Sequence, residues 1–379
     1  MRDVAERESF DMGKWLMPHT FENDFLFNPS PRDFTVEEIP LYPFSGSGEH
    51  LILKVRKKSL STWEMLDILS SQIGLRRREI GYAGLKDKHA MTIQYISLPV
   101  SYEEKMSSFS HENIKILDMF RHDNKIRTGH LKGNRFRLRF KKVLGIQRDK
   151  IDSTLDWIEK NGLPNYFGTQ RFGRDGVNWL EGRDLAIGRK KMRDRKMREF
   201  LISSYQSYLF NGWLSRRVEI CRLLEDFTPE ETENILSLPA STLAGARKQK
   251  SFFRILGGDL MMHYPYGRLF EAEETYDESI RMASKDISVT GLLPGRRVSR
   301  ASGGAGEIEK PFDDERISER GSRRYAWIFP QSIERRYIPE KAHYELEFTL
   351  PKGSYATVVA DMLRGRYGSV AEDMENRGR

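Results

Sequence analysis

Residues 81–99, GYAGLKDKHAMTIQYISLP, decide how the rest of the chain is interpreted. Glycines and one acid between two lysines come first, and an alternating run, residues 92–98, follows. This order predicts a tight loop that leads into a β-strand, with Asp87 at the tip of the loop. In most proteins such an acid is part of a solvated surface turn. The alternative is a carboxylate that neighbouring cations keep ionised, so that it can act as a nucleophile.

The segments before this loop have the patterns of a protein with both strands and helices. Residues 34–39 and 51–55 alternate as strands, and the glycine-rich segment 45–50 between them predicts a hairpin. A helix is expected to begin after Ser61, which has the spacing of a capping box, and to end at Gly74. Three arginines come next and are compatible with a solvated helix end or with a phosphate path. Within the loop, Gly81 and Gly84 are expected where the backbone passes close to another group, because glycine has no Cβ.

The most basic part of the N-terminal half, residues 121–141, ends in a predicted strand with aromatic and aliphatic side chains on one face. The other face carries four cations, Arg135, Arg137, Arg139 and Lys141. Like charges in a row repel one another unless an anion lies across them, so the pattern favours a nucleic-acid groove. Acids on a neighbouring strand are the alternative.

A second unusual stretch, residues 164–173, PNYFGTQRFG, interleaves aromatic and polar side chains around two glycines. Aromatic rings and guanidinium groups are the surfaces on which unstacked bases pack. A buried aromatic turn explains the same composition equally well.

The C-terminal half changes character and then returns to the earlier patterns. Residues 301–324 have few apolar anchors and are expected to be mobile or extended. Residues 344–350 alternate as a strand, and Ser354 is expected to cap the helix that follows. This return predicts two domains: a discontinuous one over residues 1–191 with 330–379, and an inserted α+β domain over residues 192–329.

Composition limits the classes of function. The chain has 379 residues, a net charge of +8 and a pI near 9.3, which favour an anionic partner such as nucleic acid. No apolar run approaches the roughly 18 residues of a membrane span, and the charged N-terminus is unlike a secretory signal. The single cysteine, Cys221, excludes a disulfide framework and a cysteine zinc site and is expected to be buried. We expect a cytoplasmic protein.

Together these stretches resemble the TruD family of pseudouridine synthases, which convert uridine 13 of transfer RNA to pseudouridine. GYAGLKDKHAMTIQ, at 81–94, resembles the nucleophile motif of that family, and PNYFGTQRFG resembles its second motif. Three further matches are PRDFTVEEIP at 31–40, GHLKGNRFRL at 129–138 and LPKGSYAT at 350–357. The resemblance covers most of residues 29–178 and 330–364.

The resemblance implies an α+β fold, a mixed sheet with flanking helices that is interrupted by an inserted TRUD domain forming the other wall of an RNA cleft. It implies an isomerase that acts on uridine 13 in the D arm of tRNA, with Asp87 as the catalytic carboxylate. Phe167 would stack on the flipped base, and Asn165 would orient Asp87. Candidate RNA contacts are Lys86, Lys125, Arg127, Arg135 and Arg171. The reaction involves no redox change and no phosphate transfer, so no cofactor or metal is expected. The partner is tRNA, with no obligatory protein partner, and we expect a monomer.

Three questions stay open at this level. A non-catalytic RNA-binding module would use the same basic surface with Asp87 as a turn residue. A metal-dependent nuclease would need two or three acids close together. Finally, Lys86 and Lys88 would point away from Asp87 in an extended segment, so a cation from a distant segment is an equal candidate for its partner.

Overall fold

The computed structural model describes residues 21–86, 88, 90–173, 175–236, 239–243 and 245–365. The chain divides into two compact units. One, called the sheet unit here, is Asp24–Asp149 with Pro330–Gly353. The other, the helix unit, is Met1–Asn23, Lys150–Phe329 and Ser354–Arg379. These units are defined by compactness, and their bounds differ from those of the two domains expected from the sequence. The inserted domain over residues 192–329 stays a prediction.

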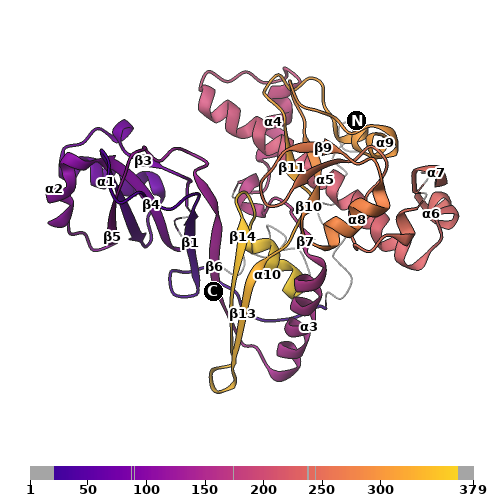
Figure 1. Ribbon diagram of the computed structural model, residues 1–379, viewed down its shortest axis with the longest axis horizontal. Coiled ribbons are helices and arrows are strands. Elements are labelled where there is room, and N and C mark those ends of the chain that lie inside the picture. The colour runs from indigo at the N-terminus through magenta and orange to yellow at the C-terminus, as the bar shows by residue number, and fades with distance from the viewer. Residues whose placement is uncertain are drawn as a thin grey trace. The chain divides into compact units, whose positions relative to one another are not determined.

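The sheet unit is built on one eight-stranded sheet with the strand order β13-β14-β6-β1-β4-β2-β5, and β3 pairs with β4 (Figure 1). Its strands are β1 Phe34–Pro40, β2 His50–Lys57, β3 Gly81–Tyr82, β4 Met91–Pro99, β5 Ile114–His122, β6 Leu131–Lys141, β13 Gln331–Ile338 and β14 His343–Pro351. β1 pairs in parallel with β4, whereas the pairings of β1 with β6, β6 with β14, β13 with β14, β2 with β4, β2 with β5 and β3 with β4 are antiparallel. The strands expected at residues 92–98 and 344–350 are thus confirmed.

The expected hairpin between β1 and β2 is wrong, because β4 lies between these two strands. Alternation along a strand indicates which side chains share a face, but it does not indicate which strand lies next to it. Here a parallel neighbour that follows later in the chain takes the central place.

One helix, α1 Thr62–Ile73, covers an apolar face of this sheet, and the short α2 Glu103–Ser107 follows β4. The capping box is confirmed: the Ser61 N–H donates to Glu64 at 2.6 Å, and the Glu64 N–H donates to the Ser61 hydroxyl at 3.2 Å. Gly74 ends the helix in the left-handed conformation, with φ 70°.

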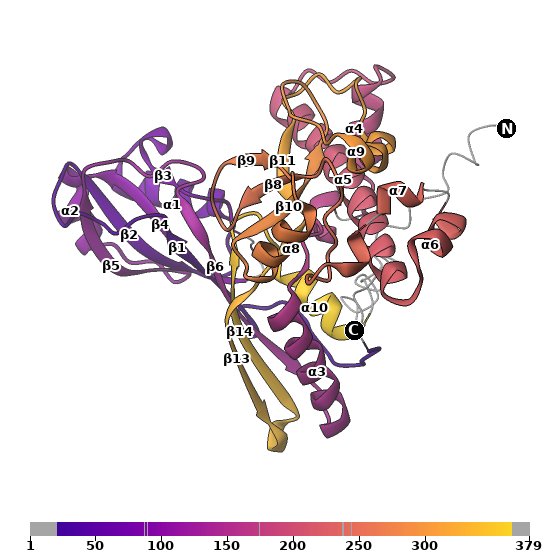
Figure 2. The same ribbon diagram turned by 45° about the vertical axis from the view of Figure 1, so that its right-hand side comes forward.

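The helix unit is built around one long helix, α5 Arg195–Asp226 (Figure 2). Its other helices are α3 Gly145–Asn161, which starts in the sheet unit, α4 Asn178–Ala186, α6 Pro229–Leu236, α7 Ala240–Leu243, α8 Thr275–Ala283, α9 Gly303–Glu309 and α10 Ala356–Arg364. A four-stranded sheet has the order β11-β10-β8-β9, and β7 pairs with β12. These strands are β7 Leu163–Pro164, β8 Leu260–His263, β9 Leu269–Glu271, β10 Ile287–Leu293, β11 Ser322–Tyr325 and β12 Trp327–Ile328.

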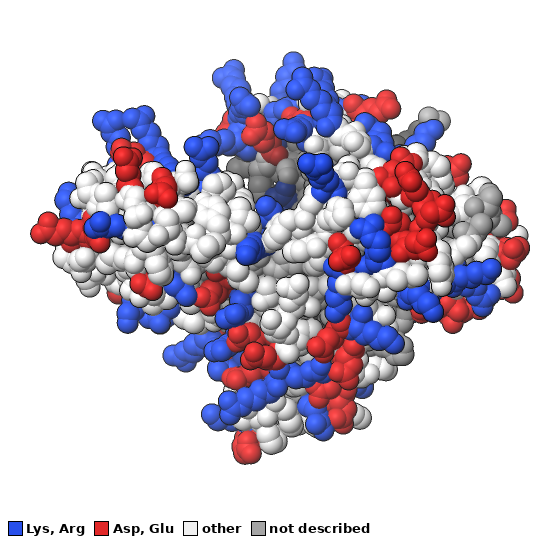
Figure 3. Space-filling model, viewed as in Figure 1, with Lys and Arg blue, Asp and Glu red and all other residues white. Residues whose placement is uncertain are grey.

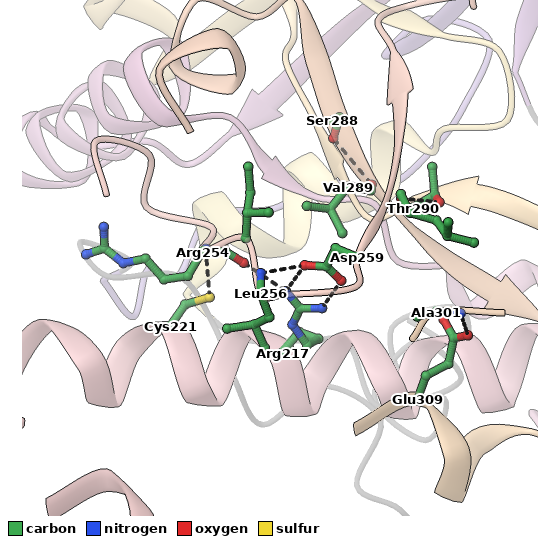
Figure 4. Close-up of polar contacts among 12 residues, drawn as sticks. Arg217, Cys221, Arg254, Leu256, Asp259, Ser288, Val289, Thr290, Ala301 and Glu309 are labelled. Atoms are coloured by element: carbon green, nitrogen blue, oxygen red, sulfur yellow. Dashed lines mark hydrogen bonds and ion pairs between the residues drawn. The ribbon is translucent and has the colours of Figure 1, made fainter. Parts of the chain in front are cut away.

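The centre of the helix unit contains a buried ion pair between α5 and the loop before β8. Arg217 binds both carboxylate oxygens of Asp259, at 2.7 and 2.8 Å, and Asp259 also accepts a hydrogen bond from the Leu256 N–H at 2.8 Å (Figure 4). One turn along the helix, the sulfur of Cys221 accepts from the Arg254 N–H at 3.2 Å. Cys221 is buried as expected, and burial raises the pKa of its thiol.

The expectation that residues 301–324 are mobile or extended is wrong for residues 303–309, which form α9, whereas β11, which begins at Ser322, is extended. The segment is fixed by an ion pair of 2.7 Å between Glu309 and Arg323, whose side chains are 3% and 4% exposed. Charged residues are buried when they are paired, so a scarcity of apolar side chains does not indicate mobility here. Ser354 also lies one residue too early: α10 has Tyr355 at its N-cap position, without a side-chain hydrogen bond.

No helix within the described part of the chain is long and apolar enough to cross a membrane.

Candidate active site

The loop that carries position 87 is anchored on its N-terminal side by a chain of hydrogen bonds within the sheet unit. The Lys86 N–H donates to the Thr62 hydroxyl at 2.8 Å, and this hydroxyl donates to the side-chain oxygen of Gln94 at 3.1 Å. On the C-terminal side Ala90 is fully buried, directly before β4. Asp87 itself lies outside the described residues, so its role stays a prediction.

The ammonium of Lys86 is buried, 3.0 Å from Glu38 and 2.7 Å from the side-chain oxygen of Asn134. The two charged side chains are 8% and 1% exposed. Burial raises the pKa of Glu38, while Lys86 and a hydrogen bond from the Tyr95 N–H act against this rise. An ammonium in this position is not accessible to a phosphate, which argues against the expected RNA contact of Lys86. It fastens the loop to β1 and β6 instead.

Lys88, on the other side of Asp87, is exposed and pairs with Glu64 at 2.8 Å. This contact, together with hydrogen bonds from Ser61, lowers the pKa of Glu64 to about 2. Both lysines beside Asp87 therefore have carboxylate partners elsewhere in the sheet unit.

Two more expected RNA contacts, Lys125 and Arg127, lie on a segment that packs beside this loop. The Ile126 carbonyl comes so close to Gly81 that an added Cβ would lie 2.3 Å from it, which confirms why glycine is needed there. At Gly84 an added Cβ would meet only ordinary contacts, the closest at 3.6 Å. The ammonium of Lys125 donates to a backbone carbonyl at 2.8 Å, and Arg127 is exposed.

The four cations on β6 pair with three carboxylates, those of Glu345, Glu347 and Asp33, and acids on a neighbouring strand were the alternative to a nucleic-acid groove. Arg137 lies 2.9 Å from Glu347, and Arg139 lies 2.9 Å from Glu345, both across the pairing of β6 with β14. The row also includes the pairs Arg135 with Glu347 at 3.6 Å and Lys141 with Asp33 at 2.5 Å. Figure 3 shows blue and red side chains side by side where Figure 1 places β13 and β14. These acids offset three of the four positive charges, so most of the repulsion along the row is relieved without a bound anion.

The aromatic turn of residues 164–173 is held by amide side chains within the helix unit. Asn165 is 3% exposed, and its side-chain N–H donates to the Tyr325 carbonyl at 2.9 Å. Asn211 of α5 binds Phe167 twice: its oxygen accepts from the Phe167 N–H at 2.8 Å, and its N–H donates to the Phe167 carbonyl at 3.0 Å. The backbone at Phe167 is thus fixed from both sides.

The ring of Phe167 packs against a guanidinium that the sequence did not single out. The central carbon of Arg324, on β11, lies 3.9 Å from the ring centroid, a distance that places the guanidinium over a face of the ring. Phe210 meets the ring edge-to-face at 5.6 Å, and Tyr355 lies 5.9 Å away. Burial lowers the pKa of Arg324 to about 10, an effect that Arg171 strengthens and Tyr355 opposes.

The guanidinium of Arg324 also donates hydrogen bonds to Asn165. The backbone oxygen of Asn165 accepts at 2.9 and 3.2 Å, and its side-chain oxygen accepts at 2.9 Å. Arg171 joins the same cluster: its guanidinium lies 5.8 Å from the Phe167 ring and donates to Ser207 at 3.1 Å. The structure therefore brings Asn165, Phe167 and Arg171 together, and adds Arg324.

The nuclease alternative needs a group of acids. Among the residues that the structure describes, no three His, Cys, Asp or Glu side chains are grouped so that they would hold a metal ion.

Comparison with known proteins identifies the family. The sequence profile of tRNA pseudouridine synthase D (TruD) matches residues 26–192 and 243–362. The tRNA pseudouridine synthase D of Nitratiruptor sp. is 53% identical over 343 residues, 90% of this chain and 95% of that protein. The protein of the same name from Sulfurimonas denitrificans is 54% identical over 343 residues, 90% of this chain and 96% of that protein. The chain belongs to the TruD family.

The TruD fold is also found among solved structures. The crystal structure described as TruD of Methanosarcina mazei matches with a TM-score of 0.68 at 21% identity, covering 96% of this chain and 98% of that one. The expected α+β fold and the family are thus confirmed. As a TruD enzyme the protein is an isomerase that converts uridine to pseudouridine in tRNA.

Proposed function

We propose that this TruD enzyme isomerises uridine 13 in the D arm of tRNA, with Asp87 as the catalytic carboxylate and Phe167 as the residue that stacks on the flipped base. The main observation in support of the proposal is the way in which Phe167 is held by its neighbours. Its backbone is fixed by Asn211 and one ring face is covered by Arg324, yet the residue is only half-buried. A rigid, partly accessible ring is what an unstacked uracil needs as a support.

The reaction explains why these groups are needed. The bond between ribose C1′ and uracil N1 breaks, the uracil turns, and C1′ bonds to C5 of the same uracil. C5 then loses its proton and N1 gains one, so the net reaction is an isomerisation. Flipping the nucleotide costs a few kcal/mol of lost stacking, which a ring such as Phe167 offsets by its own stacking. Asp87 supplies the carboxylate, from a loop whose preceding residue, Lys86, is fixed by Glu38 and Thr62.

Phosphate contacts supply most of the affinity for tRNA in this proposal. Lys125, Arg127 and Arg171 are the first candidates, because they lie beside the Asp87 loop or the Phe167 ring in their own units. Arg135 is also a candidate, since its side chain is 54% exposed and its carboxylate partner is 3.6 Å away. An inserted domain over residues 192–329, a cytoplasmic location and a monomeric state belong to the same proposal.

Mapping pseudouridine in tRNA from cells that lack the protein tests the proposal. We expect the modification to disappear from position 13 and to return when the wild-type gene is restored. The matched control is a gene for the Asp87→Asn variant, which should not restore it. Loss of pseudouridine at a different position would overturn the assignment of uridine 13, and an unchanged tRNA would overturn the proposal as a whole.

A further inference from the structure

Two neighbouring arginines of β11 have different surroundings. Arg323 forms the buried ion pair with Glu309, so the fold of the helix unit accounts for it. Arg324 instead contacts two residues of the aromatic turn, Asn165 and Phe167. These contacts reach from β11 to a segment more than 150 positions earlier in the chain.

The geometry of the guanidinium makes this double contact specific. It is planar and carries N–H donors at its edge. In Arg324 the edge donates to the backbone and side-chain oxygens of Asn165, at 2.9 Å each, while the guanidinium carbon lies 3.9 Å from the centre of the Phe167 ring. A lysine ammonium has no plane to lie on the ring while it donates in this way.

We propose that Arg324 is a positioning residue of the isomerase reaction: it covers one face of Phe167, leaves the opposite face to the uracil, and holds the side chain of Asn165. This inference rests on the proposed roles of Phe167 and Asn165. With one face covered and the backbone held by Asn211, the orientation of the ring toward the base is restrained. Small errors in the placement of reacting groups lower rates strongly, so the contact affects rate more than binding.

The charge of Arg324 acts in the same direction. When the bond between C1′ and N1 breaks, its electron pair stays on the uracil, which gains negative charge. A cation behind the supporting ring stabilises that charge, and its partial burial strengthens the effect. Arg171, whose guanidinium lies 5.8 Å from the same ring, adds to this field.

The test compares Arg324→Lys and Arg324→Met with the control Arg281→Lys. Arg281 also lies over a phenyl ring, 5.6 Å from the centroid of Phe270, and pairs with Glu278, but it belongs to α8. Single-turnover release of tritium from tRNA with 5-tritiated uridine gives the rate, and filter binding gives Kd. We expect both Arg324 variants to react about 30-fold more slowly with Kd changed less than about threefold. The control should equal the wild type.

A double-mutant cycle separates this inference from the proposed function. If Arg324 acts mainly through Phe167, Arg324→Met should slow the Phe167→Ala enzyme by less than about threefold. Full additivity, or a wild-type rate for Arg324→Lys, would overturn the inference while the role of Phe167 stands. A wild-type rate for Phe167→Ala alone would instead overturn the proposed stacking. Thermal unfolding is recorded for each variant. If neither Arg324 variant folds, Arg324 is needed for the fold itself, and the inference is overturned.

Discussion

Cations gather in two regions of this molecule, and the two regions use them in opposite ways. On β6 four cations stand in a row on an exposed strand face, and each has a carboxylate partner on β14 or at Asp33. Around Phe167 the guanidinium of Arg324 packs on an aromatic ring and donates to Asn165. The row is conspicuous in the sequence, whereas the cluster is assembled only by the fold.

The energetics of the two regions differ as well. Exposed ion pairs contribute about 0–1 kcal/mol each, because water solvates both partners when they separate. Removing the partners of a partly desolvated cation costs more free energy, because water does not fully replace the lost hydrogen bonds. A row of exposed charges in the sequence is thus a weaker guide to function than a cation whose burial costs free energy.

The largest effect on stability is expected at the buried pair beneath the Asp87 loop. Lys86→Met leaves Glu38 buried without its ammonium, which should lower the free energy of unfolding by about 3 kcal/mol in urea. Lys88→Met, which breaks an exposed pair with Glu64, is the control and should lower it far less, because water solvates both partners. Equal losses in the two variants would contradict the distinction between buried and exposed cations.

Removal of the aromatic ring should have the next largest effect. Phe167→Ala is expected to slow single-turnover tritium release by about 100-fold and to change Kd for tRNA less than about threefold, because stacking serves the flipped base and phosphates supply the affinity. Phe167→Tyr keeps a stacking face and should stay within about fivefold of the wild-type rate. A variant that lost affinity but kept its rate would disprove the stacking role.

The pH dependence of stability tests the burial of Glu38. Its pKa is raised in the folded state, so the stability that this carboxyl contributes is complete below its ordinary pKa of 4.5 and is lost as the pH rises through the raised value. The Glu38→Gln variant has no carboxyl group at this position, so it lacks this contribution to the pH dependence of stability. The unfolding free energy of the wild type should therefore fall relative to that of Glu38→Gln between pH 4.5 and 7, measured in urea at several pH values. A constant difference, or one of opposite sign, would show that the pKa is not raised.

The smallest effect is expected on the β6 row. Arg137→Met should change Kd for tRNA less than twofold and leave its salt dependence unaltered, because Arg137 is paired with Glu347 at 2.9 Å. Arg127→Met, at an exposed proposed phosphate contact, should reduce the slope of log K against log salt by about 1. If Arg137→Met reduced the slope equally, the row would be a nucleic-acid groove after all.

Local features of the fold were predictable from the sequence because they depend on neighbouring residues. The capping box of Ser61, the stop at Gly74 and the alternation of β4 and β14 each involve contacts within a few positions. The order of strands was not predictable in this way, since the pairing of β1 with β4 depends on the whole sheet.

The candidate site was predictable only where long motifs resembled the family. Asn165, Phe167 and Arg171 lie within such a motif, and the structure brings them together. Arg324 lies in a segment with few apolar side chains, which predicted a mobile or extended chain. Its role was not predictable because its partners are 157 to 159 positions away (324 − 167 and 324 − 165). Lys86 was placed among the RNA contacts because the sequence does not show that Glu38 and Asn134 cover it.

The central claim is that one carboxylate, at position 87, performs the chemistry while the rest of the protein presents the nucleotide. The most direct measurement is single-turnover tritium release by Asp87→Asn, with binding of the same tRNA measured alongside. We predict no measurable release and a Kd within about threefold of the wild type, because phosphate contacts are unaffected. Release at the wild-type rate would contradict the claim and reduce Asp87 to a residue of a turn.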